Sequence, residues 1–300
     1  MSYTAVVLIV ISATVHATWN LRGKSRNPSA AFFLVGDGTI ALLGMPLWFV
    51  FRKLYADLPA SFWGLVAATG ASQAVYYIGL AYAYRSGDLS IAYPLIRALP
   101  VLFIPALSFL LERGKQIHAL GLCGMGAIAA GCVFMALYQF FRGARAGRTS
   151  MFFAVIGALG SVGYTMIDDE ALHLIKASPA FTLEPGLAAL TYIPAITSST
   201  ALWLTLFTCF NRGERAAFGE IWRTARLYTA LTGVMIWLSY GLALAAMVYV
   251  TDVSYVAAFR QLSIPIGAVL GMTLLKEPRL PARIIGVAII AAGLVLVALG

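Results

Sequence analysis

Long uncharged apolar segments dominate this sequence and constrain its fold more than any other feature. Ten of them recur along the 300 residues, each close to the roughly 20 apolar residues that a membrane-spanning helix needs. They cover residues 3–21, 29–51, 61–84, 91–111, 118–141, 151–170, 187–210, 227–250, 254–275 and 281–299. No polar break between them is long enough for a soluble domain, and the longest, from Asn211 to Arg226, predicts a short helix on the membrane surface. The sequence therefore predicts an all-α membrane protein with ten transmembrane helices.

Composition supports the lipid bilayer as the main solvent of this chain. Charged residues make up 11% of the sequence and hydrophobic residues 61%, whereas an ordinary soluble domain has about 25% charged residues. A soluble surface needs more polar cover than this. These values exclude a soluble enzyme, a nucleic-acid-binding module and a disordered chain. The net charge of +9 is explained by Lys and Arg in loops beside the membrane.

The second half of the sequence repeats the first. Pro100 precedes Glu112 by twelve residues, and Pro265 precedes Glu277 by the same number. Three further matches follow in the same two regions: Gly124 with Gly286, Ala129-Ala130-Gly131 with Ala291-Ala292-Gly293, and Asp88-Leu89-Ser90 with Asp252-Val253-Ser254. Single Gly or Ala matches are common in membrane helices, but an ordered set across two consecutive helices is not. We interpret residues 1–141 and 151–300 as two copies of one five-helix unit.

An odd number of helices in each copy has a topological consequence. The second copy must enter the membrane from the side opposite to the first, which makes the two copies inverted repeats. Secondary transporters share this plan, and their substrate site lies between the repeats near the middle of the bilayer. The repeat therefore favours transport over receptor or enzyme functions.

Several motifs resemble the drug/metabolite transporter superfamily, specifically its ten-helix EamA-type branch. They are His16-Ala17-Thr18-Trp19-Asn20, the run from Asp88 to Arg97 (DLSIAYPLIR), and the two Pro-to-Glu spacings. The resemblance covers the whole chain. It implies export of amino acids or other metabolites, while relatives in organelles exchange phosphorylated compounds. The resemblance also implies an integral protein of the bacterial inner membrane.

The distribution of basic residues predicts the orientation in that membrane. The breaks after the first, third, fifth, seventh and ninth segments hold or border 14 Lys and Arg residues, against 5 on the other side. Because Lys and Arg accumulate in cytoplasmic loops, this count places both termini outside the cytoplasm. The family resemblance favours both termini inside. We follow the charge count, and a reporter fused after Gly300 distinguishes the two topologies.

Two arginines lie inside predicted membrane helices, where a charge costs roughly 2.5–3.5 kcal/mol on insertion scales. Arg97 is six residues into its segment, and Arg260 is six residues into the corresponding segment of the second half. Each is therefore about 9 Å inside its own membrane edge. One guanidinium per repeat in the hydrophobic core predicts a binding site for an anionic group.

Asp37 and His16 share the predicted depth of Arg97. One interpretation is a structural pair between Arg97 and Asp37 that locks two helices together, since buried pairs often serve packing. The other is functional: Arg97 holds an anionic group of the substrate, and Asp37 or His16 takes a proton or an ammonium group.

Helical spacing groups the remaining candidates for substrate contact. Positions one and two turns apart share a face of a helix, which aligns polar and aromatic side chains in several segments. Packing or an aromatic belt at the interface explains any one of these side chains, whereas the collected set predicts a lined pocket. With the two arginines, this set is Tyr93, Trp19, Asn20, Tyr77, Tyr164, Trp237, Tyr240 and Gln261.

We therefore expect a secondary active transporter, most often an exporter in this family. Its substrate is a small polar metabolite with an anionic group, such as an amino acid or a related zwitterion. An organophosphate or phosphonate transporter or exchanger is the nearest alternative. A second alternative is a cationic drug or amine exporter built on Asp37 with Trp19 and Tyr77. A third, from another class, is a membrane-embedded lipid-modifying enzyme.

Some chemistry has no support in the sequence, and we expect neither a metal nor a cofactor. Three histidines and no Cys/His clusters argue against a metal site. The run from Asp168 to Glu170 is acidic, but its position near the end of its predicted segment favours a solvated helix cap. Gly267 and Gly271 are spaced for close helix packing. Such packing is also compatible with a homodimer.

Overall fold

The computed structural model describes residues 2–23, 29–86, 89–112, 114–142, 147–274, 276 and 280–300, with the backbone alone for 20–23, 89–93 and 115. Helices make up nearly all of this, and the described residues include no strand. The α-helices are α1 (Tyr3–Gly23), α2 (Ala30–Val50), α3 (Arg52–Asp57), α4 (Ala60–Ser86), α5 (Leu89–Leu110), α6 (Ala119–Phe141), α7 (Arg148–Ala177), α8 (Ala188–Phe210), α9 (Arg212–Thr224), α10 (Arg226–Met247), α11 (Val253–Phe259), α12 (Ser263–Leu274) and α13 (Pro281–Leu299). Three 3₁₀ turns complete the fold: η1 (Gly114–Gln116), η2 (Pro185–Leu187) and η3 (Arg260–Leu262).

Every predicted segment is helical. Nine correspond to one helix each, and 254–275 corresponds to α11, η3 and α12 in succession. The break from Asn211 to Arg226 contains α9, as predicted. The largest error in a boundary is in α7, which continues for seven residues beyond the predicted end at residue 170.

The chain is an all-helical protein with the features of an integral membrane protein. Within its described part, seven helical stretches are long and apolar enough to cross a membrane. They are Ala30–Val50, Ala119–Phe141, Arg148–Ala177, Pro185–Phe210, Arg226–Met247, Val253–Leu274 and Pro281–Leu299. Large apolar side chains such as Phe49, Phe141 and Phe210 are exposed on the outside of the molecule. Exposed apolar surface of this extent is typical of contact with lipid.

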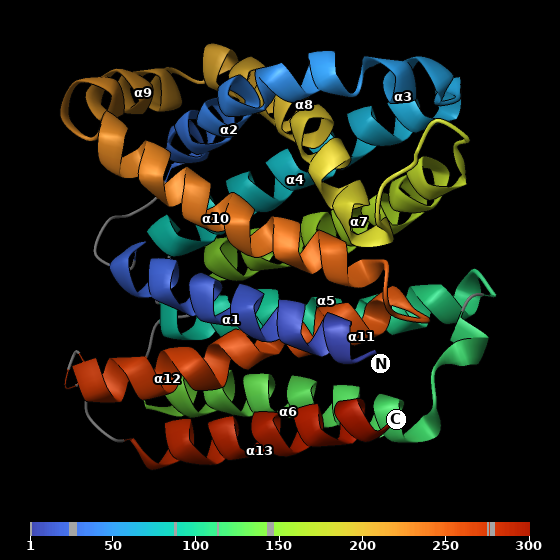
Figure 1. The fold of residues 1–300 in the computed structure, drawn as a ribbon. Coiled ribbons are helices and arrows are strands. Elements are labelled where there is room, and N and C mark those ends of the chain that lie inside the picture. The colour runs from blue at the N-terminus through green and yellow to red at the C-terminus, as the bar shows by residue number, and fades with distance from the viewer. Residues whose placement is uncertain are drawn as a thin grey trace.

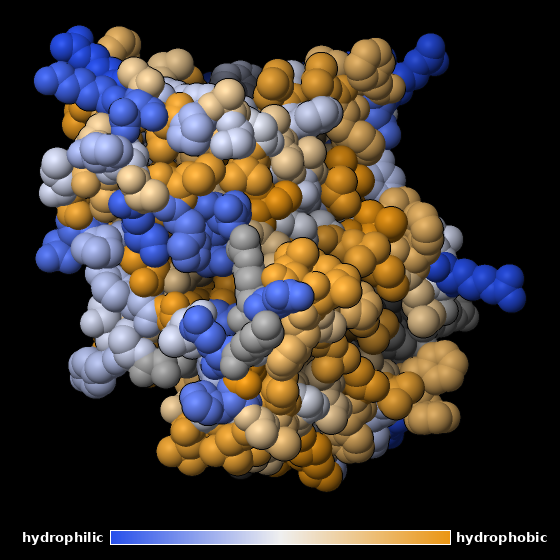
Figure 2. All heavy atoms as spheres, turned by 90° about the vertical axis from the view of Figure 1, so that its right-hand side faces the viewer, coloured by the Kyte–Doolittle hydropathy of each residue, from blue (hydrophilic) through white to orange (hydrophobic). Residues whose placement is uncertain are grey.

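The helices run back and forth between two ends of the molecule, and both termini lie at the same end (Figure 1). The most extensive packing joins α4 to α7, α6 to α13, α1 to α10 and α2 to α8. In Figure 1, α6, α12 and α13 form one side of the molecule, while α2, α8 and α9 form the opposite side. Figure 2 views the end with the termini, where hydrophilic residues gather over one part and hydrophobic residues cover the rest.

Glycines allow close approach between helices of the two halves of the chain. A Cβ added at Gly124 of α6 would lie 2.6 Å from the Gly293 oxygen of α13, and one at Gly293 would lie 2.7 Å from the Gly124 oxygen. Gly267 of α12 faces Ala17 of α1. These small residues therefore serve packing within one chain, which leaves the predicted homodimer without support from them.

The surface helix α9 is tied to the ends of α2 and α4 by a buried carboxylate. Glu214 is fully enclosed, and its Oε2 accepts a hydrogen bond of 3.0 Å from the backbone N–H of Ala31 in the first turn of α2. Its Oε1 accepts a bond of 2.8 Å from Arg85 near the end of α4. Asn211, which caps α9, also donates to the Tyr82 hydroxyl at 3.1 Å. A negative group at a helix N-terminus is favourable because the free N–H groups point at it.

Replacing Glu214 by Gln is expected to destabilise this contact. The amide NH₂ group of Gln would face either the Ala31 N–H or the Arg85 guanidinium, and both of these are hydrogen-bond donors. Hydrogen bonds to charged groups contribute about 1.5–3 kcal/mol each. Glu220→Gln is the matched control, since Glu220 lies on the same helix and is exposed. Thermal unfolding of the purified protein in detergent checks the prediction. Equal melting temperatures for the two variants would contradict it.

Candidate functional site

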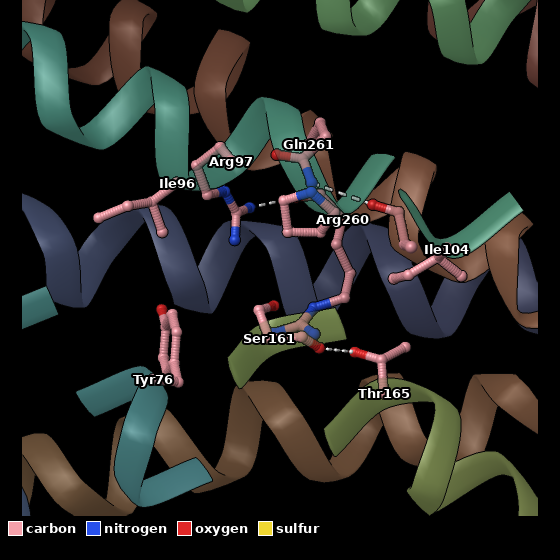
Figure 3. A pocket seen from close by; sticks show the side chains of 10 residues that line it. Tyr76, Ile96, Arg97, Ile104, Ser161, Thr165, Arg260 and Gln261 are labelled. Carbon is pink, nitrogen blue, oxygen red and sulfur yellow. Dashed lines mark hydrogen bonds between the residues drawn. The ribbon is translucent and has the colours of Figure 1, made fainter. Parts of the chain in front are cut away.

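A small cavity lies between α4, α5, α7, α11 and η3 (Figure 3). It is enclosed by helices from both halves of the chain. Its lining residues are Tyr76, Ile96, Arg97, Pro100, Ile104, Ser161, Thr165, Ala257, Arg260 and Gln261. Arg97, Arg260 and Gln261 were predicted from the sequence, and the structure brings them together at this cavity.

The break between α11 and α12 places Arg260 and Gln261 in the wall. A 3₁₀ turn, η3, interrupts the helix here, and such a turn inside a longer helix often marks a functional position. Arg97 of α5 reaches this turn and donates from one terminal nitrogen to the backbone oxygen of Arg260 and to the Ser263 hydroxyl, both at 2.8 Å. The side chain of one predicted arginine thus holds the backbone of the other.

Neither arginine forms an ion pair with a carboxylate of the described residues. Arg97 is buried, and its Nε has no hydrogen-bond partner there. The guanidinium of Arg260 lies 5.0 Å from the centre of the Tyr240 ring and extends toward Ser161 in Figure 3. Such a cation–π contact stabilises a desolvated guanidinium without neutralising its charge. The structural pair between Arg97 and Asp37 that the sequence left open is therefore not formed.

Asp37 binds a tryptophan instead of an arginine. Its Oδ1 accepts a hydrogen bond from the indole nitrogen of Trp237 in α10. Its Oδ2 is buried and has no partner among the described residues. Tyr77 lies close enough to interact electrostatically with Asp37, and its ring stacks on Phe33 at 4.3 Å. Asp37 thus presents an unused carboxylate oxygen beside aromatic rings.

His16 of α1 interacts with both arginines and with Trp19 of the same helix. It is within electrostatic range of both Arg97 and Arg260. Trp19 contacts His16 edge-on, with ring centres 5.2 Å apart, and the Trp19 indole nitrogen has no partner within the described part of the chain. The side chains of Asn20 and Tyr93, also predicted to contact substrate, lie outside the described residues.

A chain of aromatic contacts connects the remaining predicted residues to the cavity wall. Tyr76, which lines the cavity, contacts Tyr77 at 5.4 Å and Tyr164 at 5.6 Å between ring centres. Tyr240 contacts Tyr164 at 5.4 Å and Trp237 at 5.6 Å. Edge and tilted ring pairs of this kind stabilise a packed aromatic cluster. The predicted tyrosines and Trp237 therefore form one connected layer beside the arginines.

The structure corrects the interpretation of Asp168 as a solvated helix cap. Asp168 lies within α7, nine residues before its end at Ala177, and is fully buried. Its Oδ1 accepts hydrogen bonds from Thr69 at 2.6 Å and Tyr192 at 2.9 Å, and its Oδ2 accepts one from Tyr240. Its neighbour Asp169 instead pairs with His173 one turn later. The three acidic residues 168–170 therefore do not act as one cluster.

Several polar residues of the site were not predicted from the sequence. One of them is Tyr76, whose neighbour Tyr77 was predicted in its place. Ser161 and Thr165 belong to α7. Together with Asp168 they follow the i, i+4, i+7 spacing of one helix face, which was a usable signal. Among the described residues no group of His, Cys, Asp and Glu could hold a metal ion.

Comparisons with known proteins bear on the fold alone. No protein-family model and no curated protein matches the sequence. Solved structures do match, and one of them, described as "Crystal structure of protein", covers 100% of this chain and 99% of its own length. Its TM-score is 0.67 at 12% sequence identity. At this level of identity the likeness shows a shared fold over the whole chain.

Proposed function

We propose that this chain is a secondary active transporter for a small polar metabolite that carries an anionic group, with an amino acid or related zwitterion as the preferred substrate. The observation that carries the proposal is the pair of arginines at one cavity, without a carboxylate partner in the described residues. A buried guanidinium of this kind is suited to bind a carboxylate or phosphate, which it contacts with two parallel N–H groups. Organophosphates and phosphonates share this anionic chemistry.

We further propose ten membrane spans in two inverted repeats, as in the EamA-type branch of the drug/metabolite transporter superfamily. The pairing of helices supports this proposal. If α1, α2, α4, α5 and α6 correspond to α7, α8, α10, α11–α12 and α13, the α1–α10 contact becomes the α7–α4 contact. The α2–α8, α5–α11 and α6–α13 contacts each map onto themselves. Alternating access would follow from rocking one repeat against the other around the cavity.

The proposed location is the inner membrane of a bacterium, with lipid as the surrounding partner. Export or exchange is the proposed direction, and Asp37 or His16 is the coupling group that the sequence suggests. His16 lies within electrostatic range of both guanidinium groups, and Asp37 has one carboxylate oxygen without a hydrogen-bond partner among the described residues.

One observation favours a different function, the export of cationic drugs or amines. The Oδ2 of Asp37 has no hydrogen-bond partner among the described residues, and the same side chain interacts with Tyr77 and Trp237. A carboxylate with aromatic neighbours is a suitable site for an organic cation. In a zwitterion transporter the same oxygen would receive the ammonium group.

A thermal-shift screen tests these candidates against each other. Purified protein is heated with amino acids, phosphonates, sugar phosphates or amines, because a ligand bound to the folded state raises its melting temperature. At a concentration one hundred times the Kd the stabilisation is about 2.7 kcal/mol. We expect shifts only from compounds with an anionic group. Shifts confined to amines without such a group would support the cation exporter and contradict the anion proposal.

A further inference from the structure

Asp168 is held by hydroxyl groups from three other helices. Thr69 belongs to α4, Tyr192 to α8 and Tyr240 to α10, and all three donate to its carboxyl group. No described Lys, Arg or His forms an ion pair with it. Burial in a low-dielectric interior disfavours a charge, whereas donated hydrogen bonds stabilise it. Burial thus favours the protonated form of Asp168, and the three donated hydrogen bonds favour the ionised form.

Two connections join Asp168 to the cavity. Thr165, one turn earlier on α7, lines the cavity wall. Tyr240, which donates to Asp168, also carries the guanidinium of Arg260 over its ring at 5.0 Å. Arg260 itself interacts electrostatically with Asp168. A change of charge at Asp168 is therefore felt at the arginine that lines the cavity.

We propose that Asp168 is a proton-binding site linked to anion binding at the Arg97–Arg260 cavity. In the step itself, a hydronium ion of the surrounding water transfers a proton to one carboxylate oxygen. One O–H bond of the hydronium breaks, an O–H bond forms on the carboxyl group, a water molecule remains, and the charge of the side chain changes from −1 to zero. The hydroxyl that donated to that oxygen loses its acceptor and turns to another partner or accepts the new proton. No other bond forms or breaks, and no further reactant is needed.

The linkage between proton binding at Asp168 and anion binding at the cavity has a definite sign. An ionised Asp168 opposes a second negative charge at the cavity, because charges interact strongly where water is excluded. Protonation removes this repulsion and releases the positive field of Arg260 toward the ligand. By thermodynamic reciprocity a bound anion must also strengthen proton binding at Asp168. Proton and anionic ligand therefore bind together. The identity of the ligand rests on the proposed function, while the proton site does not.

The groups that face Asp168 come from each element around it. On its own helix, Tyr164 lies four residues earlier and contacts the Tyr240 ring, while Asp169 pairs with His173. From the helices packed against it come Tyr192, Tyr240 and the uncharged Thr69, and from η3 comes Arg260. Two further titratable groups line the cavity, Tyr76 of α4 and Arg97 of α5.

Infrared difference spectroscopy during a pH titration tests the proton site without any ligand. A buried protonated carboxyl group has a carbonyl band that is separate from carboxylate bands. We expect this band in the wild type on acidification, its persistence in Asp37→Asn, and its loss in Asp168→Asn. Loss of the band in Asp37→Asn with persistence in Asp168→Asn, or no titrating band in folded wild type, would overturn the proposal.

A second variant guards against a folding defect in Asp168→Asn. Tyr240→Phe removes one donor to the carboxylate and leaves the acid in place, so the ionised form loses a stabilising bond. The carbonyl band should then persist to higher pH than in the wild type. Tyr138→Phe is the matched control, because Tyr138 is on α6 at the outer surface beside Arg142. Identical titrations for wild type and Tyr240→Phe would contradict the assignment of the band to Asp168.

The linkage is tested with alanine, whose carboxylate stays ionised across the titration. The thermal shift that alanine produces should grow as the pH falls in the wild type, and should be independent of pH in Asp168→Asn. A shift with the same pH dependence in both proteins would overturn the linkage. If the infrared band behaves as expected but neither alanine nor any compound of the thermal-shift screen binds, the proposed function fails and the proton site stands.

Discussion

Arg260→Gln is expected to reduce transport of anionic substrates about 30-fold or more. Removing one partner of a buried charged interaction costs about 2–5 kcal/mol, and each 1.4 kcal/mol corresponds to a factor of ten. The guanidinium lines the cavity and lies over Tyr240, and no described carboxylate forms an ion pair with it. Uptake of the compounds that shift the melting temperature, measured in proteoliposomes, checks the prediction.

Arg142→Gln is the matched control for this experiment. Its guanidinium also lies over a tyrosine ring, Tyr138, at 5.8 Å, but the pair is exposed at the end of α6. Transport by this variant should equal that of the wild type. Unchanged transport of every accepted substrate in Arg260→Gln would refute the proposal that Arg260 binds the anionic group.

Arg97→Gln should give a different result from Arg260→Gln. Arg97 holds the break between α11 and α12 through the Arg260 oxygen and the Ser263 hydroxyl. Its loss should therefore lower both transport and the melting temperature, whereas Arg260→Gln should affect mainly transport. The two melting curves, recorded beside the uptake assays, separate a role in structure from a role in binding.

Gly79→Val is expected to cause the largest loss of stability, because it separates the extensively packed helices α4 and α7. A Cβ at Gly79 would lie 2.5 Å from the backbone nitrogen of Gly157 and 2.8 Å from the Phe153 oxygen. Backbone atoms cannot turn aside as a flexible side chain does. Overpacking of a close contact costs typically about 1–3 kcal/mol, and more where the helices must separate.

Gly64→Val provides the control on the same helix. A Cβ at Gly64 meets nothing within 4 Å, so this variant carries the same change in helix propensity without the clash. We expect a melting temperature near that of the wild type for Gly64→Val and one lower by several degrees for Gly79→Val. A similar decrease in both would assign the effect to propensity and contradict the packing argument.

The positions of the helices could be predicted because the bilayer imposes a length and a polarity on each segment. The end of α7 could not, because its last two turns carry charged residues such as Asp169 and Lys176 and extend beyond the apolar run. The 3₁₀ turn at Arg260 was also missed, since no Gly or Pro lies within Arg260–Leu262 to indicate a break in the helix.

Only those site residues whose charge is energetically costly inside an apolar segment could be predicted from the sequence. Arg97, Arg260 and Asp37 are conspicuous in apolar segments, whereas the role of Asp168 depends on tertiary contacts. The hydroxyls of Thr69, Tyr192 and Tyr240 that enclose it come from three helices far apart in the sequence. Spacing along one helix carries no information about such partners.

The contact between Arg97 and the Arg260 backbone has a mechanical consequence. A solute that draws the Arg97 guanidinium to itself takes a donor away from the Arg260 oxygen and the Ser263 hydroxyl. The break between α11 and α12 then loses the two hydrogen bonds by which Arg97 holds it. Occupancy of the cavity would in this way loosen the backbone at this break directly, because Arg97 both lines the cavity and holds the break.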